Sequence, residues 1–152
     1  MKSFLNKADI NEIITRLATV QSNNPARWGR MNAHQMICHL SDAFRLALGE
    51  KAASPAGNIL HRTLIKFVAI HVPAPWPRGF PTRPEMDQEI KGTPPYEFER
   101  DRQELEQLIA RFVSITQDAH RPPHPIFGQM SHNEWMRWGW LHSDHHLRQF
   151  GA

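Results

Sequence analysis

Seven of the twelve prolines lie between residues 73 and 95, and this cluster constrains the fold more than any other feature of the sequence. Proline fixes one backbone angle and has no N–H group, so it interrupts the interior of a helix. The stretch therefore predicts a long crossover between two helical parts of the chain. Loops of this length often carry function, but proline-rich segments are extended without any ligand. We favour the interpretation of a connector that packs across the bundle surface.

Apolar residues recur at helical spacing on both sides of this crossover, and no segment alternates apolar and polar residues as a strand does. The expected fold class is therefore all-α, a bundle with four long helices and long crossovers. Five segments in all have helical spacing, over approximately residues 9–21, 33–48, 58–72, 96–116 and 131–149. Three of them begin with capping-box spacing, which pairs Asp9 with Glu12, Asn32 with Gln35 and Ser131 with Glu134.

The segment 58–72 differs from the others because it is apolar nearly all round. Such a pattern predicts a buried helix. His61 and His71 lie ten residues apart on it, too far to bind one ion, and are expected to be core or groove histidines.

Length and composition narrow the class of protein. A chain of 152 residues normally forms one domain, so residues 1–152 are expected to fold as a single bundle. One cysteine, Cys38, excludes an internal disulfide and, without a secretory signal, favours the cytoplasm. No apolar run is long enough for a membrane span. The net charge is only +3 and the basic residues are dispersed, so nucleic acid is not an expected partner.

Histidine is the unusual residue, with ten in the chain. His142 and His146 lie one helical turn apart, a spacing that lets two imidazoles meet one ion. His145 competes as the second ligand. A third ligand must come from another helix, and His39, at the edge of an apolar stripe, is the best donor. The residues alone leave metal binding and a satisfied core cluster as equal alternatives.

Two motifs in this chain resemble the DinB/YfiT-like superfamily. One is WGRMNAHQMICHLSD over residues 28–42, and the other is HSDHHLRQFG over residues 142–151, preceded by HPIFG at 124–128 and by Glu134-Trp135. The proline-rich PWPRGFPT at 75–82 is similar to a branch of that superfamily whose function is unknown. The resemblance covers nearly the whole chain.

The resemblance implies an up-down-down-up four-helix bundle, often dimeric, with a divalent metal ion held by three histidines. Its three ligand positions fall on His39, His142 and His146. Zn, Ni or Fe would suit such ligands. Related members are transferases or isomerases that use low-molecular-weight thiols, so a thiol or another small molecule is the expected partner. The alternative is a non-catalytic metal- or small-molecule-binding bundle, and no catalytic residue is identified.

Further side chains around these motifs carry expectations of their own. Asp42 either orients a ligand imidazole or is an exposed helix carboxylate. Gln149 is expected to hydrogen-bond to His145, and Cys38 to be a buried apolar residue. Trp76 is expected at the mouth of a pocket.

His34 and His132 lie in the first turns of their helices and are expected to be solvated.

Overall fold

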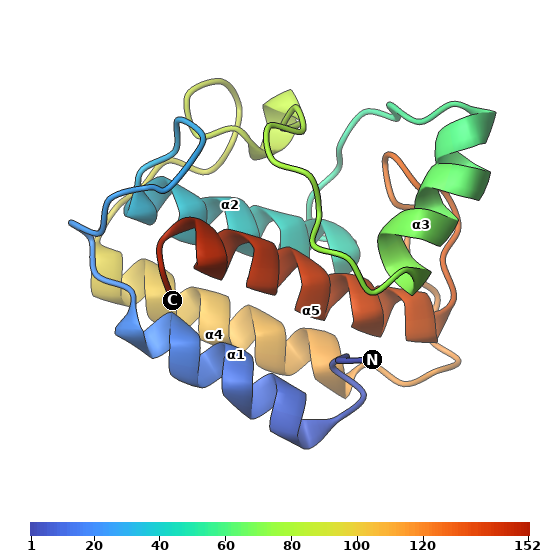
Figure 1. The fold of residues 1–152 in the computed structure, drawn as a ribbon, viewed down its shortest axis with the longest axis horizontal. Helices are drawn as coiled ribbons and strands as arrows, with labels where there is room; N and C mark the ends of the chain where they lie inside the picture. Colours follow the sequence, from blue (N-terminus) through green and yellow to red (C-terminus); the bar gives the residue numbers. More distant parts are fainter.

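The computed structural model describes residues 1–152 and contains helices but no strand, which confirms the all-α prediction. The only β-type pairing is an isolated bridge between His124 and Gly128. Figure 1 shows the long helices side by side, with a shorter helix, α3, at one end of them. The helices are α1 (Lys7–Thr19), α2 (Ala33–Ala47), α3 (Lys66–His71), α4 (Phe98–Ser114) and α5 (His132–Gln149).

The core lies between the four long helices, where α2 packs on α4 and α5, and α1 packs on α5. Aromatic rings fill its centre. The ring of Phe44 on α2 lies 5.1 Å from that of Phe112 on α4 and 6.0 Å from that of Trp138 on α5, between centroids. Because these rings come from three helices, their packing fixes how α2 and α5 face each other.

Two of the three predicted capping boxes are present. Asn32 caps α2 with Gln35, and Ser131 caps α5 with Glu134, each pair through reciprocal hydrogen bonds. The box predicted at Asp9 is wrong. Asn6 caps α1 instead, and the Asp9 carboxylate accepts a hydrogen bond from the backbone N–H of Ser3, outside the helix.

The segment 58–72 is helical, as a π-helical turn (His61–Ile65) that continues into α3, but the prediction that it is buried is wrong. Only Ile70 is fully buried, while the side of the helix away from α5 faces solvent. His71 is exposed and His61 is half-buried at the surface, so neither is a core histidine. An all-round apolar pattern does not reveal which side meets the bundle. The exposed apolar residues here are Ile59, Leu60, Leu64, Ile65, Phe67 and Val68.

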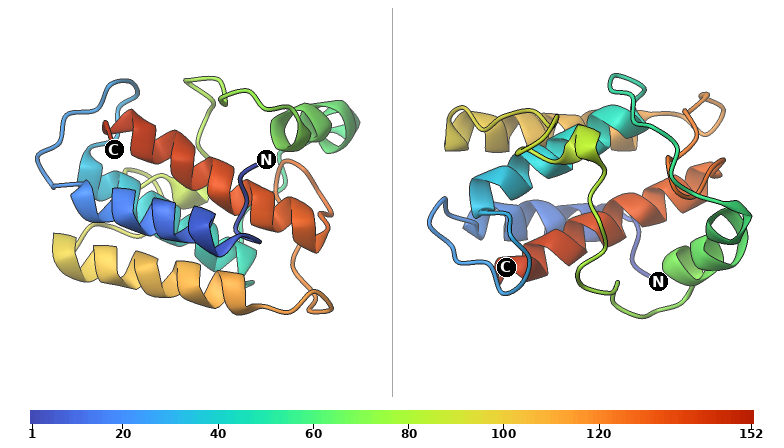
Figure 2. Two further views of the ribbon diagram at one scale, coloured as in Figure 1. Left: turned by 60° about the horizontal axis from the view of Figure 1, so that its bottom comes forward. Right: turned by 90° about the horizontal axis from the view of Figure 1, so that it is seen from above.

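The proline-rich crossover leaves α3 and returns over α5 to α2, with one 3-10 turn at Pro84–Met86 (Figure 2). Asp42 on α2 anchors its far end. This carboxylate is fully buried, accepts hydrogen bonds from the backbone N–H and the hydroxyl of Thr93, and pairs with Arg45 and Lys51. The crossover is therefore held at a defined position above the bundle.

None of the helices combines the length and the apolar character that crossing a membrane requires.

Candidate metal centre

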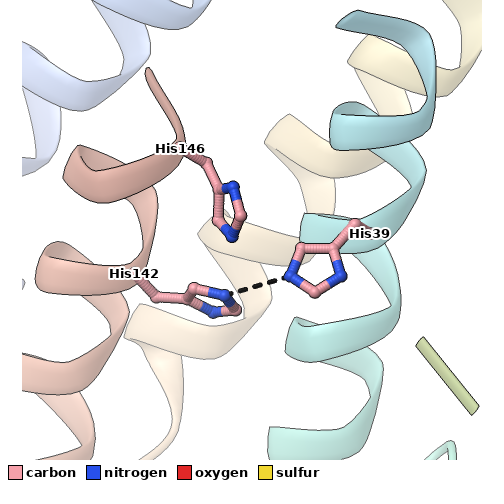
Figure 3. A group of neighbouring side chains, drawn as sticks. All are labelled: His39, His142 and His146. Atoms are coloured by element: carbon pink, nitrogen blue, oxygen red, sulfur yellow. Dashed lines mark hydrogen bonds between the residues drawn. The ribbon is translucent and has the colours of Figure 1, made fainter. Parts of the chain in front are cut away.

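Three histidines from two helices point toward one another between α2 and α5 (Figure 3). His39 lies in the middle of α2, where its apolar stripe faces α5, and His142 and His146 lie one turn apart on α5. His39 and His146 are buried, and His142 is partly exposed. The sequence-predicted ligand residues are thus brought together, and one nitrogen from each lies within 4.8 Å of the others.

The spacing of these nitrogens matches a shared ion. The Nε2 atoms of His39 and His142 are 3.2 Å apart. Two nitrogens bound to one tetrahedral zinc ion at about 2.05 Å are about 3.3 Å apart. The imidazole centroids lie 4.7 to 5.2 Å from one another, so all three rings surround the same point.

The outer nitrogen of His39 has a backbone partner. Its Nδ1 lies 2.9 Å from the carbonyl oxygen of Met86, in the 3-10 turn of the crossover. A carbonyl only accepts, so Nδ1 carries the proton and Nε2 presents its lone pair to the centre. Hydrogen bonds of this kind commonly orient metal-bound histidines. The crossover is therefore more than the surface connector that its composition favours.

The outer nitrogen of His146 is held by a side chain. Its Nδ1 lies 2.8 Å from Oε1 of Gln149, and the Gln149 amide nitrogen donates to the carbonyl oxygen of Trp28 at 2.7 Å. The second bond fixes which end of the amide faces the imidazole, so Nδ1 donates and Nε2 is free to accept. The prediction that Gln149 bonds to His145 is wrong, because His146 takes this contact.

All three imidazoles are held in the neutral form. Burial lowers the pKa of His39, although the Met86 carbonyl opposes this effect. Burial and the neighbouring histidines lower the pKa of His142 and of His146 well below the ordinary value. A neutral imidazole has a free lone pair, which is the form that binds a metal ion.

His142 differs from the other two because its Nδ1 is buried without a hydrogen-bond partner. Its ring lies between two indoles, 5.0 Å from Trp138 and 5.9 Å from Trp76 between centroids. Trp76 is half-buried, and its Nε1 donates to the carbonyl of Ala69. The crossover thus brings Trp76 against the histidine cluster, and its expected place at the mouth of a pocket stays a prediction.

His145 is not one of the three converging residues. Its ring lies 5.7 Å from Trp28 and 6.2 Å from Trp76, on the outer side of the cluster. The Arg78 guanidinium in turn stacks on Trp28 at 4.4 Å. These residues form an aromatic rim with a cation beside the histidines. Nothing in the helical spacing of the motifs predicts Arg78 or Met86, because both come from the irregular crossover.

Asp42 follows neither of its two sequence interpretations. It is fully buried, so it is not an exposed carboxylate, and it makes no hydrogen bond to His39. It acts on the cluster in two other ways: its negative charge opposes the lowering of the His39 pKa, and it anchors the crossover that carries Met86.

A second group of side chains, His34, Cys38 and Asp101, joins α2 to α4. His34 is not solvated as predicted, since its Nε2 lies 2.7 Å from the Asp101 carboxylate. The Cys38 thiol is buried, as predicted, and lies 3.7 Å from the same oxygen. Burial and Asp101 raise the pKa of Cys38 to about 12, so the thiol stays protonated. The group is best explained as a hydrogen-bonded contact between the helices.

The structure thus defines an all-helical protein with a buried group of three histidines that could hold a metal ion. The chain belongs to the family described as "Protein of unknown function (DUF1569)", whose model matches residues 2–152. No curated protein and no solved structure matches the chain.

Proposed function

We propose that His39, His142 and His146 bind one divalent metal ion, and that the protein is a metal-dependent enzyme of the DinB/YfiT-like type. The observation that carries this proposal is the convergence of three neutral imidazoles, each with one nitrogen close to the same point. Two of the three are oriented by acceptors at Nδ1. These acceptors leave the Nε2 atoms of His39 and His146 directed at the centre, as in metal-bound histidines.

Three histidine ligands leave coordination positions for water or substrate, as in catalytic metal sites. A bound ion would supply Lewis acidity and lower the pKa of a coordinated water or thiol. Around it, Trp76 and Trp138 shield the site from water, and Arg78 offers a positive charge at the rim. This setting suits a small thiol that carries a negatively charged group, so a thiol transferase is the reaction class we propose.

The alternative is a non-catalytic metal-binding bundle. It is favoured by one observation: no titratable side chain other than histidine lies in the cluster as an obvious general base.

The four-helix topology and the homodimer that the resemblance implies belong to the same proposal. The packing of α1 on α5 and of α2 on α4 and α5 supports the topology, and sedimentation analysis tests the dimer.

Metal content tests the ligand set. The purified proteins are dialysed against zinc, and the metal that stays bound is measured. His142→Ala and His146→Ala should each hold much less metal than the unaltered protein. Two control variants should keep the metal. His145→Ala changes the residue next to a ligand on the same helix, and His71→Ala changes a residue at the surface. Equal metal content in His142→Ala and His145→Ala would contradict the assignment.

Cobalt substitution separates the enzyme from the non-catalytic bundle. The absorption spectrum of the Co(II) protein reports ligand number and type. We expect a small thiol to add a sulfur-to-cobalt charge-transfer band, because an open position accepts it. An unchanged spectrum at saturating thiol would reject thiol chemistry and favour the non-catalytic alternative.

A further inference from the structure

A cavity of about 340 Å³ lies at the N-terminus of α5, at the opposite end of that helix from the histidine cluster. Ten residues separate His132 from His142, which places the two regions about 15 Å apart along the helix. Small-molecule pockets start at about this size. The polar residues that line it include Gln117, Asp118, Arg121, Gln129, Ser131 and His132.

Arg121 is a buried cation in this lining without an acidic partner. Its side chain is only 7% exposed, and one terminal nitrogen donates to the carbonyl of Phe112 at 3.0 Å. Its Nε and its other terminal nitrogen are buried with no hydrogen-bond partner. Burial lowers the pKa of Arg121 to about 10, so the guanidinium is still charged at neutral pH. A buried charge without a counter-ion is costly.

More unsatisfied donors meet Arg121 in the cavity. Ser131 caps α5 by binding the N–H of Glu134, but no protein group accepts from the backbone N–H of His132. His132 Nδ1 is also buried without a partner, and burial, together with the charge of Arg121, lowers the pKa of His132. The N-terminus of an 18-residue helix adds partial positive charge.

Two carboxylates lie near the cavity, and neither neutralises Arg121. Asp118 lines the cavity but is exposed to solvent, and it makes no ion pair with Arg121. Glu134 is occupied, because it closes the capping box with Ser131 and pairs with Lys66.

We infer that this cavity binds a phosphate group, as the free ion or as a small phosphate ester. Arg121 supplies a positive charge and two N–H donors, at Nε and the second terminal nitrogen, that no protein group accepts from. The helix N-terminus and His132 supply donors from other directions, which suits a tetrahedral anion with several oxygens better than a planar carboxylate. The volume exceeds that of one inorganic ion and leaves room for an organic part of the ligand.

The test is a phosphate titration of metal-free protein at pH 7, with ionic strength held constant by chloride. Phosphate should raise the melting temperature, and calorimetry should give a dissociation constant in the millimolar range or below. Glycerol phosphate is titrated in parallel. The ligand with the lower dissociation constant, the free ion or the ester, is the one that the cavity prefers. If phosphate and its ester stabilise no more than chloride does, the proposal is overturned.

Variants locate the effect. Arg121→Gln should abolish the phosphate shift, and His132→Gln should weaken binding about tenfold, while Arg100→Gln, which removes an exposed arginine on α4, should change nothing. If Arg121→Gln fails to fold, His132→Gln decides the matter, because that imidazole has no partner to lose. Equal affinity in His132→Gln and Arg100→Gln overturns the proposal. His142→Ala should bind phosphate normally, so this test is independent of the metal site.

Discussion

Protonation of His124 should lower the stability of the fold more clearly than protonation of any other residue. Its Nδ1 accepts hydrogen bonds from the backbone N–H groups of Ile126 and Phe127, and its ring packs on Trp138 and Phe127. Burial lowers its pKa to about 3. The unfolded chain therefore binds the proton more tightly, so the stability from the neutral ring is fully present above about pH 6.5 and is lost as the pH falls toward 3.

At pH 5 this single residue should cost about 2 kcal/mol in the free energy of unfolding, at about 1.4 kcal/mol per pH unit below 6.5. In His124→Asn the amide oxygen can still accept the two backbone bonds but does not titrate. Urea unfolding of both proteins at pH 7.5 and 5 measures the difference. An equal loss of stability in the variant would show that His124 is protonated in the fold.

Gln149 should matter to the ion although it does not touch it. In Gln149→Met the Nδ1 of His146 loses its acceptor, and the ring is free to turn. We expect metal affinity to fall about 10- to 100-fold, the usual effect of removing such a partner. Competition with a chelator measures the constant. Gln103→Met, at an exposed position on α4, is the matched control and should bind as tightly as the unaltered protein.

At the scale of the elements, the two sides of the 61–71 helix should respond very differently to truncation. Ile70→Ala opens a cavity at a fully buried position and should cost about 2–5 kcal/mol. Leu64, on the same helix, is 56% exposed, so Leu64→Ala should change the free energy of unfolding by less than about 0.5 kcal/mol. A large loss in Leu64→Ala would mean that this surface is covered in solution.

Asp42 should couple the crossover to the histidine cluster. Removing the buried charge in Asp42→Asn leaves Lys51 and Arg45 short of a partner, and breaking a buried pair costs about 3–5 kcal/mol. Because the freed crossover also carries Met86, metal affinity should fall with stability. Asp144→Asn, at a partly buried pair with Arg16, should cost less and leave the metal affinity unchanged. Loss of stability alone in Asp42→Asn would show that Met86 is positioned by other contacts.

What the sequence predicts well is local. Helical spacing locates α2 and α5, their caps follow from Asn32 and Ser131, and together these place His39, His142 and His146 on facing stripes. What it misses depends on distant contacts. The carbonyl that holds His39 belongs to Met86, 47 residues away in an irregular segment, and main-chain groups leave no mark in a sequence. The exposed side of α3 is missed because apolar residues surround that helix.

For the whole molecule, a bound ion should raise the melting temperature. Metal at about 100 times its dissociation constant adds about 2.7 kcal/mol to the stability of the folded state. For a domain of this size that corresponds to about 5–11 °C. Calorimetric scans with zinc and with excess chelator measure the shift. The same shift in a protein carrying both His142→Ala and His146→Ala would place the ion elsewhere.

The ion would also act on the kinetics of folding, because His39 and His142 are separated by 103 residues. Closing so long a loop comes late, after the neighbouring helices have packed. Contacts made after the transition state change the rate of unfolding and leave the rate of folding nearly constant. Metal should therefore lower the unfolding rate at every denaturant concentration without changing the slope of the unfolding arm of the chevron. The folding arm should stay in place. In the cell, the same ion would set how long a folded copy lasts rather than how quickly it forms.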